Sequence, residues 1–272
     1  MRWINLQPGR GAKLALALAP FALLLVVYAA GSAARLAANA RDKLLPGLGD
    51  FAEAINRLVF VADARTGDYI LWTDTLASLS RLVCGLGIGV AIALVIGMLI
   101  GMLPYMRALL SPFVAALSMV PPLALLPIIF IIAGLGETSK IALIAIGVTP
   151  IMIRDLALRA AEIPREQIVK AQTLGGSSWQ IAIRVVLPQI LPRLITCLRL
   201  QLGPAWLFLI AAEAISSDAG LGYRIFLVRR YLSMDIIFPY VAWITLLAAG
   251  MDWSLDALRR KIFPWTVLEN PS

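Results

Sequence analysis

Three long runs without a charged residue constrain this chain more than any other feature of its sequence. They are Leu14–Ala34, Leu82–Met106 and Ala108–Gly136, of 21, 25 and 29 residues. Because a helix crosses the hydrocarbon core of a bilayer with about 20 mostly apolar residues, each run is long enough to span. The chain is 60% hydrophobic and 15% charged, whereas soluble proteins average about 25% charged residues. The sequence therefore predicts an integral membrane protein.

Shorter apolar runs in the second half of the chain predict three further spans. Ile141–Ile153 and Leu200–Ala212 have 13 residues each and Ile236–Met251 has 16, lengths that also fit buried or re-entrant segments. Charges near the ends of a span can snorkel or face the bundle interior, which extends each run to about 20 residues. We expect these three to be the less lipid-exposed helices. The prediction is an all-α fold with six transmembrane helices, at about residues 14–34, 76–104, 109–134, 138–157, 190–214 and 236–257.

The distribution of basic residues predicts that both termini face the cytoplasm. With this orientation the internal segments hold 13 basic and six acidic residues, and the external segments hold nine and ten. Cytoplasmic loops are enriched in Lys and Arg, so the bias accounts for the net charge of +8 without nucleic acid. Ala38-Asn39-Ala40 is similar to a signal-peptide cleavage site. The 21-residue run before it exceeds the usual roughly 7–15 residues, so we expect the first helix to be retained.

The residue types that are missing exclude several kinds of chemistry. The sequence has no histidine, which excludes Ser-His-Asp triads, HExxH zinc sites and histidine-ligated haem. Cys84 and Cys197 lie in apolar runs and are interpreted as inert buried thiols. Gly134–Lys140 lacks the GxxxxGK(S/T) spacing of a phosphate-binding loop. We therefore expect no catalytic, cofactor or metal site in this chain.

Residues 35–75 form the main external segment, which is too polar to span. Asp50, with Glu53 three residues later, predicts a helix N-cap and its reciprocal acid. The apolar residues that follow on one helical face are Phe51, Ile55, Leu58 and Val59. This pattern predicts a short amphipathic surface helix, either as a docking surface for an external partner or as a packed connection.

Small residues recur at every fourth position of the second span, at Gly85, Gly89, Ala93, Gly97 and Gly101. Such a stripe lets another helix backbone approach closely. We interpret it as packing within the chain rather than as a dimer seam.

Prolines interrupt the third span. Pro121, Pro122 and Pro127 remove backbone donors, so the helix should bend or break there. Irregular backbone at membrane depth is tolerated only against protein or a water-lined cavity. Pro121, Pro122 and Leu123 are therefore candidates for a translocation pathway, and the alternative is a purely structural kink.

The most informative stretch is the long internal segment 154–193. Pro164 begins a short helix there and Gly175 ends it. Gly176 follows as a linker, and Ser177-Ser178-Trp179-Gln180 has the capping-box pattern that opens another helix. An apolar ridge on the short helix consists of Ile168, Ala171 and Leu174 with Gly175. Because a solvated loop would not need that ridge, we interpret it as the contact surface for a partner.

Further motifs accompany this elbow. A first group of motifs consists of Ala171–Gln180, followed in the sequence by Arg184–Pro188 and Leu191-Pro192. A second group consists of Pro121–Pro127, Gly134–Lys140, Ala212-Glu213 and Gly220–Tyr223. The first group resembles the cytoplasmic "EAA" loop of binding-protein-dependent ABC importer permeases, and the others resemble the nitrate/sulfonate/taurine branch of that family. The resemblance covers about residues 72–262. The sequence departs from the family pattern at the acidic residue for which the EAA loop is named, six residues before Gly175, where this chain has Val169.

This resemblance implies a larger transport machine. A second permease copy, as in a homodimer, and two cytoplasmic ATPase subunits that bind ATP and Mg would surround this chain in the bacterial inner membrane. An external solute-binding protein would deliver a small anion such as nitrate, taurine or another sulfonate. The short helix, placed between the fourth and fifth spans, would couple to the ATPase through Ile168, Lys170, Ala171, Leu174, Gly175, Gly176 and Ser177. The implied domains are 1–74, a transmembrane core at 75–262 and a cytoplasmic tail at 263–272.

Three charges within or beside the spans are further candidates. Arg81, Arg199 and Glu213 are costly in lipid and need a partner or water. Arg81 or Arg199 could be the counter-charge of an anionic solute on the pathway, or could pair internally with an acid. Glu213 could equally touch solute or brace the external mouth.

Two other classes of function compete with this one. An ATP-independent secondary carrier or channel would transport without an ATPase but offers no reason for the internal elbow. An intramembrane enzyme is disfavoured because the spans contain neither histidine nor paired carboxylates.

Overall fold

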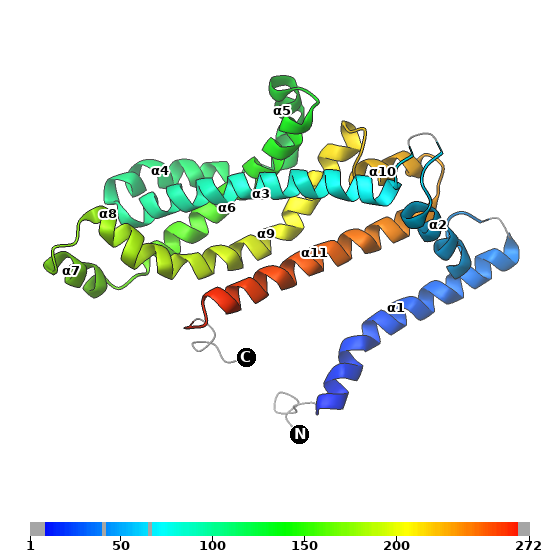
Figure 1. Cartoon of the computed structure of the whole chain (residues 1–272), viewed down its shortest axis with the longest axis horizontal. Coiled ribbons are helices and arrows are strands. Elements are labelled where there is room, and N and C mark those ends of the chain that lie inside the picture. Colours follow the sequence, from blue (N-terminus) through cyan, green and yellow to red (C-terminus); the bar gives the residue numbers. More distant parts are fainter. Residues whose placement is uncertain (1–8, 40–41, 65–66, 266–272) are drawn as a thin grey trace. The chain divides into compact units, whose positions relative to one another are not determined.

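The computed structural model describes residues 9–39, 42–64 and 67–265, and the regular elements in these ranges are all helical (Figure 1). The helices are α1 Arg10–Ala38, α2 Leu48–Phe60, α3 Ile70–Met102, α4 Pro104–Leu117, α5 Leu126–Ala133, α6 Glu137–Ala161, α7 Arg165–Thr173, α8 Ser178–Ile181, α9 Leu187–Ile215, α10 Leu221–Arg229 and α11 Met234–Ile262. Within the described ranges, five helices are long and apolar enough to cross a membrane, or six if the bent pair around α4 and α5 is one span. The all-α membrane fold is thereby confirmed.

The chain divides into two compact units. One contains the chain up to Tyr69 together with Val228–Tyr240, and the other contains Ile70–Leu227 and the chain from Val241 onward. Most of the predicted tail 263–272 lies outside the described residues.

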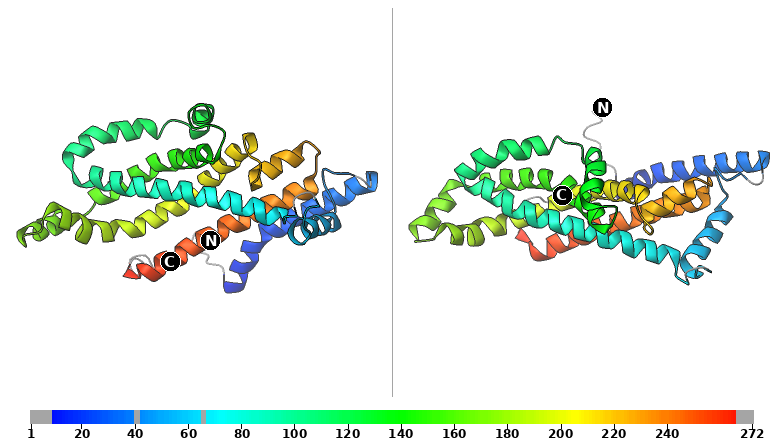
Figure 2. Two further views of the ribbon diagram at one scale, coloured as in Figure 1. Left: turned by 45° about the horizontal axis from the view of Figure 1, so that its top comes forward. Right: turned by 90° about the horizontal axis from the view of Figure 1, so that it is seen from above.

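The larger unit is built on α3, α6 and α9, which pack on one another (Figure 2). The small residues of α3 make this possible, because all five members of the predicted stripe are buried. A Cβ added at Gly85 would stand 2.7 Å from Cβ of Ile144, and one at Gly97 would stand 2.8 Å from Cβ of Leu156. The stripe therefore packs on α6 within the chain, as predicted.

The break in the third span is also confirmed. Helix α4 ends at Leu117, and the chain continues through a 3₁₀ turn at Pro122–Leu125 into α5, at an angle of 83° to α4. Pro121 precedes the turn in extended conformation, since its φ of −65° and ψ of 117° do not continue a helix.

Burial of the spans differs from the prediction at α11. In the most apolar stretch of each span, the buried share of residues is 50% for α6 and 39% for Ser178–Ile215. The buried share is 33% for α3 and 11% for α11. The expectation that the last three helices are the least exposed is wrong for α11. The apolar run of α11 is bounded by Asp235 and Asp252, and Asp252 is 45% exposed, so the shortness of the run does not indicate a buried helix.

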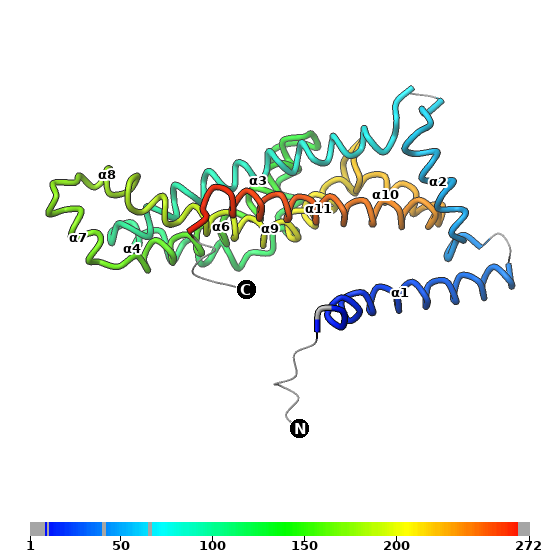
Figure 3. Tube along the Cα trace, turned by 60° about the horizontal axis from the view of Figure 1, so that its bottom comes forward, coloured from blue at the N-terminus to red at the C-terminus, as the bar shows by residue number. Residues whose placement is uncertain are grey.

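The smaller unit joins α1 to α2 (Figure 3). Tyr28 donates a hydrogen bond to the Pro46 carbonyl at 2.7 Å, and its ring lies 5.9 Å from that of Phe51 and 5.7 Å from that of Phe238, centroid to centroid. The predicted amphipathic helix is present as α2.

Its start differs from the prediction. The N-cap is Gly47, and Asp50 is the reciprocal acid whose Oδ2 accepts the Gly47 N–H at 2.8 Å. Asp50 is therefore not the cap, because the helix begins at Leu48, three residues earlier than a cap at Asp50 predicts. Leu58 is buried on the predicted face, whereas Ile55 is 42% exposed.

Candidate functional site

The end of α7 is a tight backbone turn at Gly175. The Gly176 N–H donates to the Ala171 carbonyl at 3.0 Å and the Gly175 N–H donates to the Gln172 carbonyl at 2.9 Å, the two bonds of a Schellman motif. Gly175 has a φ of +81°, which a residue with a Cβ adopts only with strain. A Cβ on Gly176 would stand 2.8 Å from the Ala171 carbonyl oxygen. Both glycines are therefore required by the shape of the turn.

The turn leads directly into a second capped helix. Ser177 Oγ accepts the N–H of Gln180 at 3.3 Å, and Gln180 Oε1 accepts the N–H of Ser177 at 2.9 Å. This confirms the predicted capping box. A π-helical turn at Ala182–Val186 then joins α8 to α9, which has Pro188 in its first turn. The elbow is thus fixed by backbone hydrogen bonds on both sides of its glycines, and Figure 1 shows α7 at the far end of the unit built on α3, α6 and α9.

The predicted ridge on α7 faces in two directions. Ile168 and Ala171 are partly buried and pack against a core cluster of the chain itself, formed by Ala160, Ile163, Ile181, Val186 and Ile190. Both residues contact the chain's own core but keep part of their surface exposed, so their contact with a partner stays a prediction. Leu174 is 81% exposed and Val169 is 54% exposed, and Lys170 is exposed as well. Of the predicted ridge, Leu174 at the end of α7 is therefore exposed, and Val169 and Lys170 belong to the exposed side of the helix.

Arg199 pairs with acids of α11. Its Nε donates to Asp252 Oδ1 at 2.8 Å and its Nη2 to Asp252 Oδ2 at 2.9 Å, and Nη1 also contacts Asp256. Closer to the elbow, Arg193 forms a two-pronged pair with Asp155 of α6, with donor–acceptor distances of 2.6 and 2.8 Å. The guanidinium of Arg199 is thus engaged in joining α9 to α11.

Glu213 lies at the opposite end of α9 from the elbow and is fully buried. Its carboxylate accepts hydrogen bonds from Ser78 Oγ at 2.8 and 3.0 Å, from Arg81 Nη1 at 2.6 Å and from the Gly222 N–H at 2.8 Å. Arg81 also pairs with Glu137 at the start of α6. Arg81 and Glu213, singled out separately in the sequence, are therefore partners across 132 residues of chain.

The same cluster fastens the loop between α9 and α10. The Gly220 N–H donates to Asp74 Oδ1 at 2.9 Å, and Arg81 Nη1 donates to the Ala219 carbonyl at 2.7 Å. Gly220 has a φ of +135°, and a Cβ there would stand 2.5–2.7 Å from the Glu213 carboxylate. Arg224 Nε binds Asp74 Oδ2 at 2.8 Å.

Sequence reasoning missed five side chains of this cluster, which are Asp74, Ser78, Glu137, Lys140 and Arg224. Their signal, except for Arg224, is that each polar residue lies within or beside the end of a predicted span, where Arg81 and Glu213 also lie. With Arg81 and Glu213, the cluster contains three cations and three carboxylates, so its formal charges balance. The cluster is buried except at Glu137, which is 58% exposed, and at Arg224, and such an arrangement can hold helices in register.

The family of binding-protein-dependent transport system inner membrane components matches residues 89–264. The chain belongs to this family. It is an ABC importer permease, an inner membrane component with several membrane-spanning helices. The match begins within α3 and ends just after α11, so it contains the elbow, the Arg199 pairs and most of the buried cluster.

Individual relatives support the same assignment. The taurine transport system permease protein TauC of Escherichia coli (strain K12) is 36% identical over 199 residues, which is 73% of this permease and 72% of that protein. SsuC of the same strain, named for aliphatic sulfonates transport, is 37% identical over 72% of this chain and 74% of its own. These relatives place the permease in the sulfonate/taurine branch. The riboflavin transport system permease protein RibX of Chloroflexus aurantiacus (strain ATCC 29366 / DSM 635 / J-10-fl) is 34% identical over 72% of this chain and 73% of its own.

A solved structure confirms the fold. The chain matches an inward-facing structure of the MetNI methionine ABC transporter with a TM-score of 0.63 and 20% identity, over 74% of this chain and 99% of that one.

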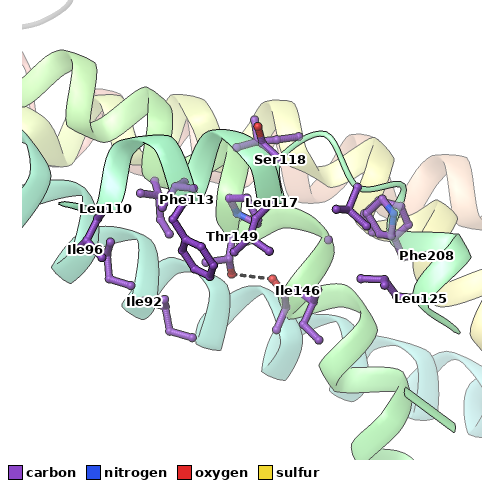
Figure 4. Close-up of a pocket in the computed structure, with 18 residues that line it drawn as sticks. Ile92, Ile96, Leu110, Phe113, Leu117, Ser118, Leu125, Ile146, Thr149 and Phe208 are labelled. Carbon is purple, nitrogen blue, oxygen red and sulfur yellow. Dashed lines mark hydrogen bonds between the residues drawn. The ribbon is translucent and has the colours of Figure 1, made fainter. Parts of the chain in front are cut away.

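Two hollows in the permease lie beside α4 and α6. One is a cavity of about 360 Å³ lined by α3, α4, α6, Phe208 of α9 and the turn at Pro122 (Figure 4). Of the pathway candidates, Pro122 lines it, whereas Pro121 and Leu123 are exposed. The other is a cleft of about 570 Å³ nearer the elbow end of α6.

Proposed function

We propose that this permease couples import of a small anion, such as taurine, another sulfonate or nitrate, to ATP hydrolysis by a separate ATPase. The observation that carries the proposal is the elbow at Gly175, a rigid, exposed projection within a chain of the ABC importer family. Two permease copies would pair with two ATPase subunits, which bind ATP and Mg, and an external binding protein would deliver the solute.

The packing of α7 supports a mechanical role. Ile168 and Ala171 rest on residues that belong to the ends of α6 and α9, so a displacement of α7 transmits directly to both helices. At their other ends, α6 and α9 are tied together by Glu137 and Glu213 through Arg81. The 25 residues of α6 correspond to a length of about 37 Å. The ATPase would therefore move these helices as one body and open or close a route beside them.

We infer the class of solute from the names of the relatives. Taurine and aliphatic sulfonates appear among them, and the sequence motifs of the branch add nitrate. RibX is named for riboflavin, so similar permeases are named for chemically different solutes. We therefore expect the binding protein to set much of the specificity.

Reconstitution tests the proposal. The permease should copurify with its ATPase, and proteoliposomes containing both should accumulate taurine or an alkanesulfonate only with ATP and binding protein. Uptake by the permease alone would instead support an ATP-independent carrier or channel.

Cysteine labelling tests the expected orientation. With an impermeant reagent in intact cells, a cysteine in place of Asp63 should react and one in place of Lys170 should not, because the elbow is expected to face the cytoplasm. Labelling at position 170 alone would overturn the orientation.

A further inference from the structure

Arg154 differs from those arginines of the α6–α9 region that are paired with acids. Its Nη1 donates to Ser118 Oγ at 2.8 Å. Within the described part of the chain, this is the one hydrogen bond that its guanidinium makes. Arg193, Arg199 and Arg81 bind carboxylates. The acid next to Arg154, Asp155, is bound by Arg193. The positive charge of Arg154 is therefore exposed at the surface of a cleft and retains donors for a ligand.

Ser118 connects this guanidinium to the apolar cavity. Ser118 lines the cavity of about 360 Å³, and Arg154 lines the cleft of about 570 Å³ beside it. The two hollows share Val114, Ile151 and Ile153, so they adjoin along the gap between α4 and α6. Figure 4 shows Ser118 at one edge of the cavity.

The cavity itself is almost wholly apolar. Its side-chain hydroxyls are those of Ser118 and Thr149, which donate to the Ala115 and Ala145 carbonyls at 2.8 and 2.6 Å. The dashed bond of Thr149 near the middle of Figure 4 shows that this hydroxyl is already used. Among the residues that line the cavity, none is a carboxylate. A cation inside it would have no partner and would be strongly disfavoured.

The mouth of the cleft carries a second basic side chain. Arg107 lines it, and its Nη2 and Nε cap the end of α3 through the Gly101 and Ile100 carbonyls at 2.6 and 3.2 Å. Its charge therefore adds to the positive potential at Arg154, and these two bonds use two of its five N–H groups. Asp155 also lines the cleft, and its carboxylate is bound by Arg193.

We propose that Arg154 and the adjoining cavity form a binding site for an amphiphilic organic sulfonate. The sulfonate would accept hydrogen bonds from Arg154 near Ser118, and the hydrocarbon part would enter the cavity beside Phe113 and Ile146. This inference rests on the proposed function and narrows its solute class. An alkanesulfonate fits both halves of the site, whereas the ammonium of taurine would lie among apolar side chains.

A matched pair of ligands tests this distinction. Propane-1-sulfonate replaces the ammonium of taurine by a methyl group at nearly the same size. Binding of each would be measured by calorimetry on the permease–ATPase complex in nanodiscs without binding protein. We expect propane-1-sulfonate to bind at least about tenfold more tightly than taurine, since burying an unpaired charge is costly. Equal affinities, or tighter taurine binding, would overturn the proposal.

Substitution of the arginine tests the head-group contact. Arg154→Gln should weaken propane-1-sulfonate binding about tenfold or more, because it removes a charge-assisted hydrogen bond, and Arg154→Lys should restore part of it. Arg159→Gln is the matched control on the same helix, since Arg159 pairs with Glu162 away from the cavity. Equal effects of Arg154→Gln and Arg159→Gln would refute the site, as would binding of phospholipid in place of the sulfonate.

Transport by the complete complex separates the two proposals. If wild-type protein with ATPase, binding protein and ATP accumulates no anion although it binds propane-1-sulfonate through Arg154, the proposed function fails and the site stands. If wild-type protein transports but Arg154→Gln binds and transports propane-1-sulfonate normally, only the site fails.

Discussion

The two ends of the α6–α9 pair are held together in different ways. At the elbow, the turn through Gly175 depends on backbone hydrogen bonds between residues at most five apart, and α7 packs on the core through Ile168 and Ala171. At the other end, Glu213 and Arg81 are buried, and their partners come from α3, α6 and the loop before α10. The elbow end is stabilised by local backbone geometry and is exposed. The other end is stabilised by buried ion pairs, whose charges would be costly without their partners. The proposed coupling role requires this difference, with a contact surface at the elbow and a fixed clamp at the other end.

The largest effect is expected at the clamp. Glu213→Ala would leave the buried guanidinium of Arg81 with an incomplete set of partners, a loss of about 3–5 kcal/mol for a broken buried pair. The melting temperature of the purified permease should fall sharply and the yield in membranes with it. Glu166→Ala on α7, an exposed acid, is the control and should change neither. Wild-type stability in the Glu213 variant would show that the clamp is not what holds these helices.

The turn of the elbow should respond differently. Gly175→Asp places a Cβ at a φ of +81°, which costs about 1 kcal/mol, and adds a charge to the exposed tip. We expect normal amounts in the membrane but loss of solute uptake and of solute-stimulated ATP hydrolysis. Measured uptake at the wild-type rate with normal expression would remove the elbow as the coupling element.

Two charge insertions separate the inner and outer faces of α7. Ala171→Glu forces a carboxylate against the core cluster, so it should lower the melting temperature as well as transport. Leu174→Glu changes a side chain that is 81% exposed, so it should leave the melting temperature within about 1 °C while reducing ATPase-coupled uptake. The reverse pattern would mean that Ala171, rather than Leu174, faces the partner.

The smallest effect is expected at Lys170. Because it is exposed, Lys170→Ala should remove no more than about 0–1 kcal/mol from any contact with the ATPase. Uptake should fall by less than about fivefold, measured beside Leu174→Glu in the same vesicles. Complete loss of uptake would indicate a buried ion pair at this position.

The contrast between the two ends also explains which features could be predicted. Gly175, the capping box at Ser177 and the break near Pro121 and Pro122 are local, because each depends on backbone conformations that a few neighbouring residues decide. The stripe on α3 was recognisable since its period is that of a helix. The packing of Ile168 and Ala171 on the chain's own core could not be predicted, because an apolar ridge has the same pattern whether it meets a partner or the core.

The sequence by itself determined the membrane class, the approximate spans, the elbow and the family, because apolar run length, helix period and turn chemistry are properties of short segments. Tertiary structure decided the partners of the charges. It joined Arg81 to Glu213 and Arg199 to Asp252, and it left the Arg154 side chain facing a cleft beside an apolar cavity. Nothing in the spacing of these residues distinguishes a paired arginine from an available one, because the pairing depends on which helices lie side by side.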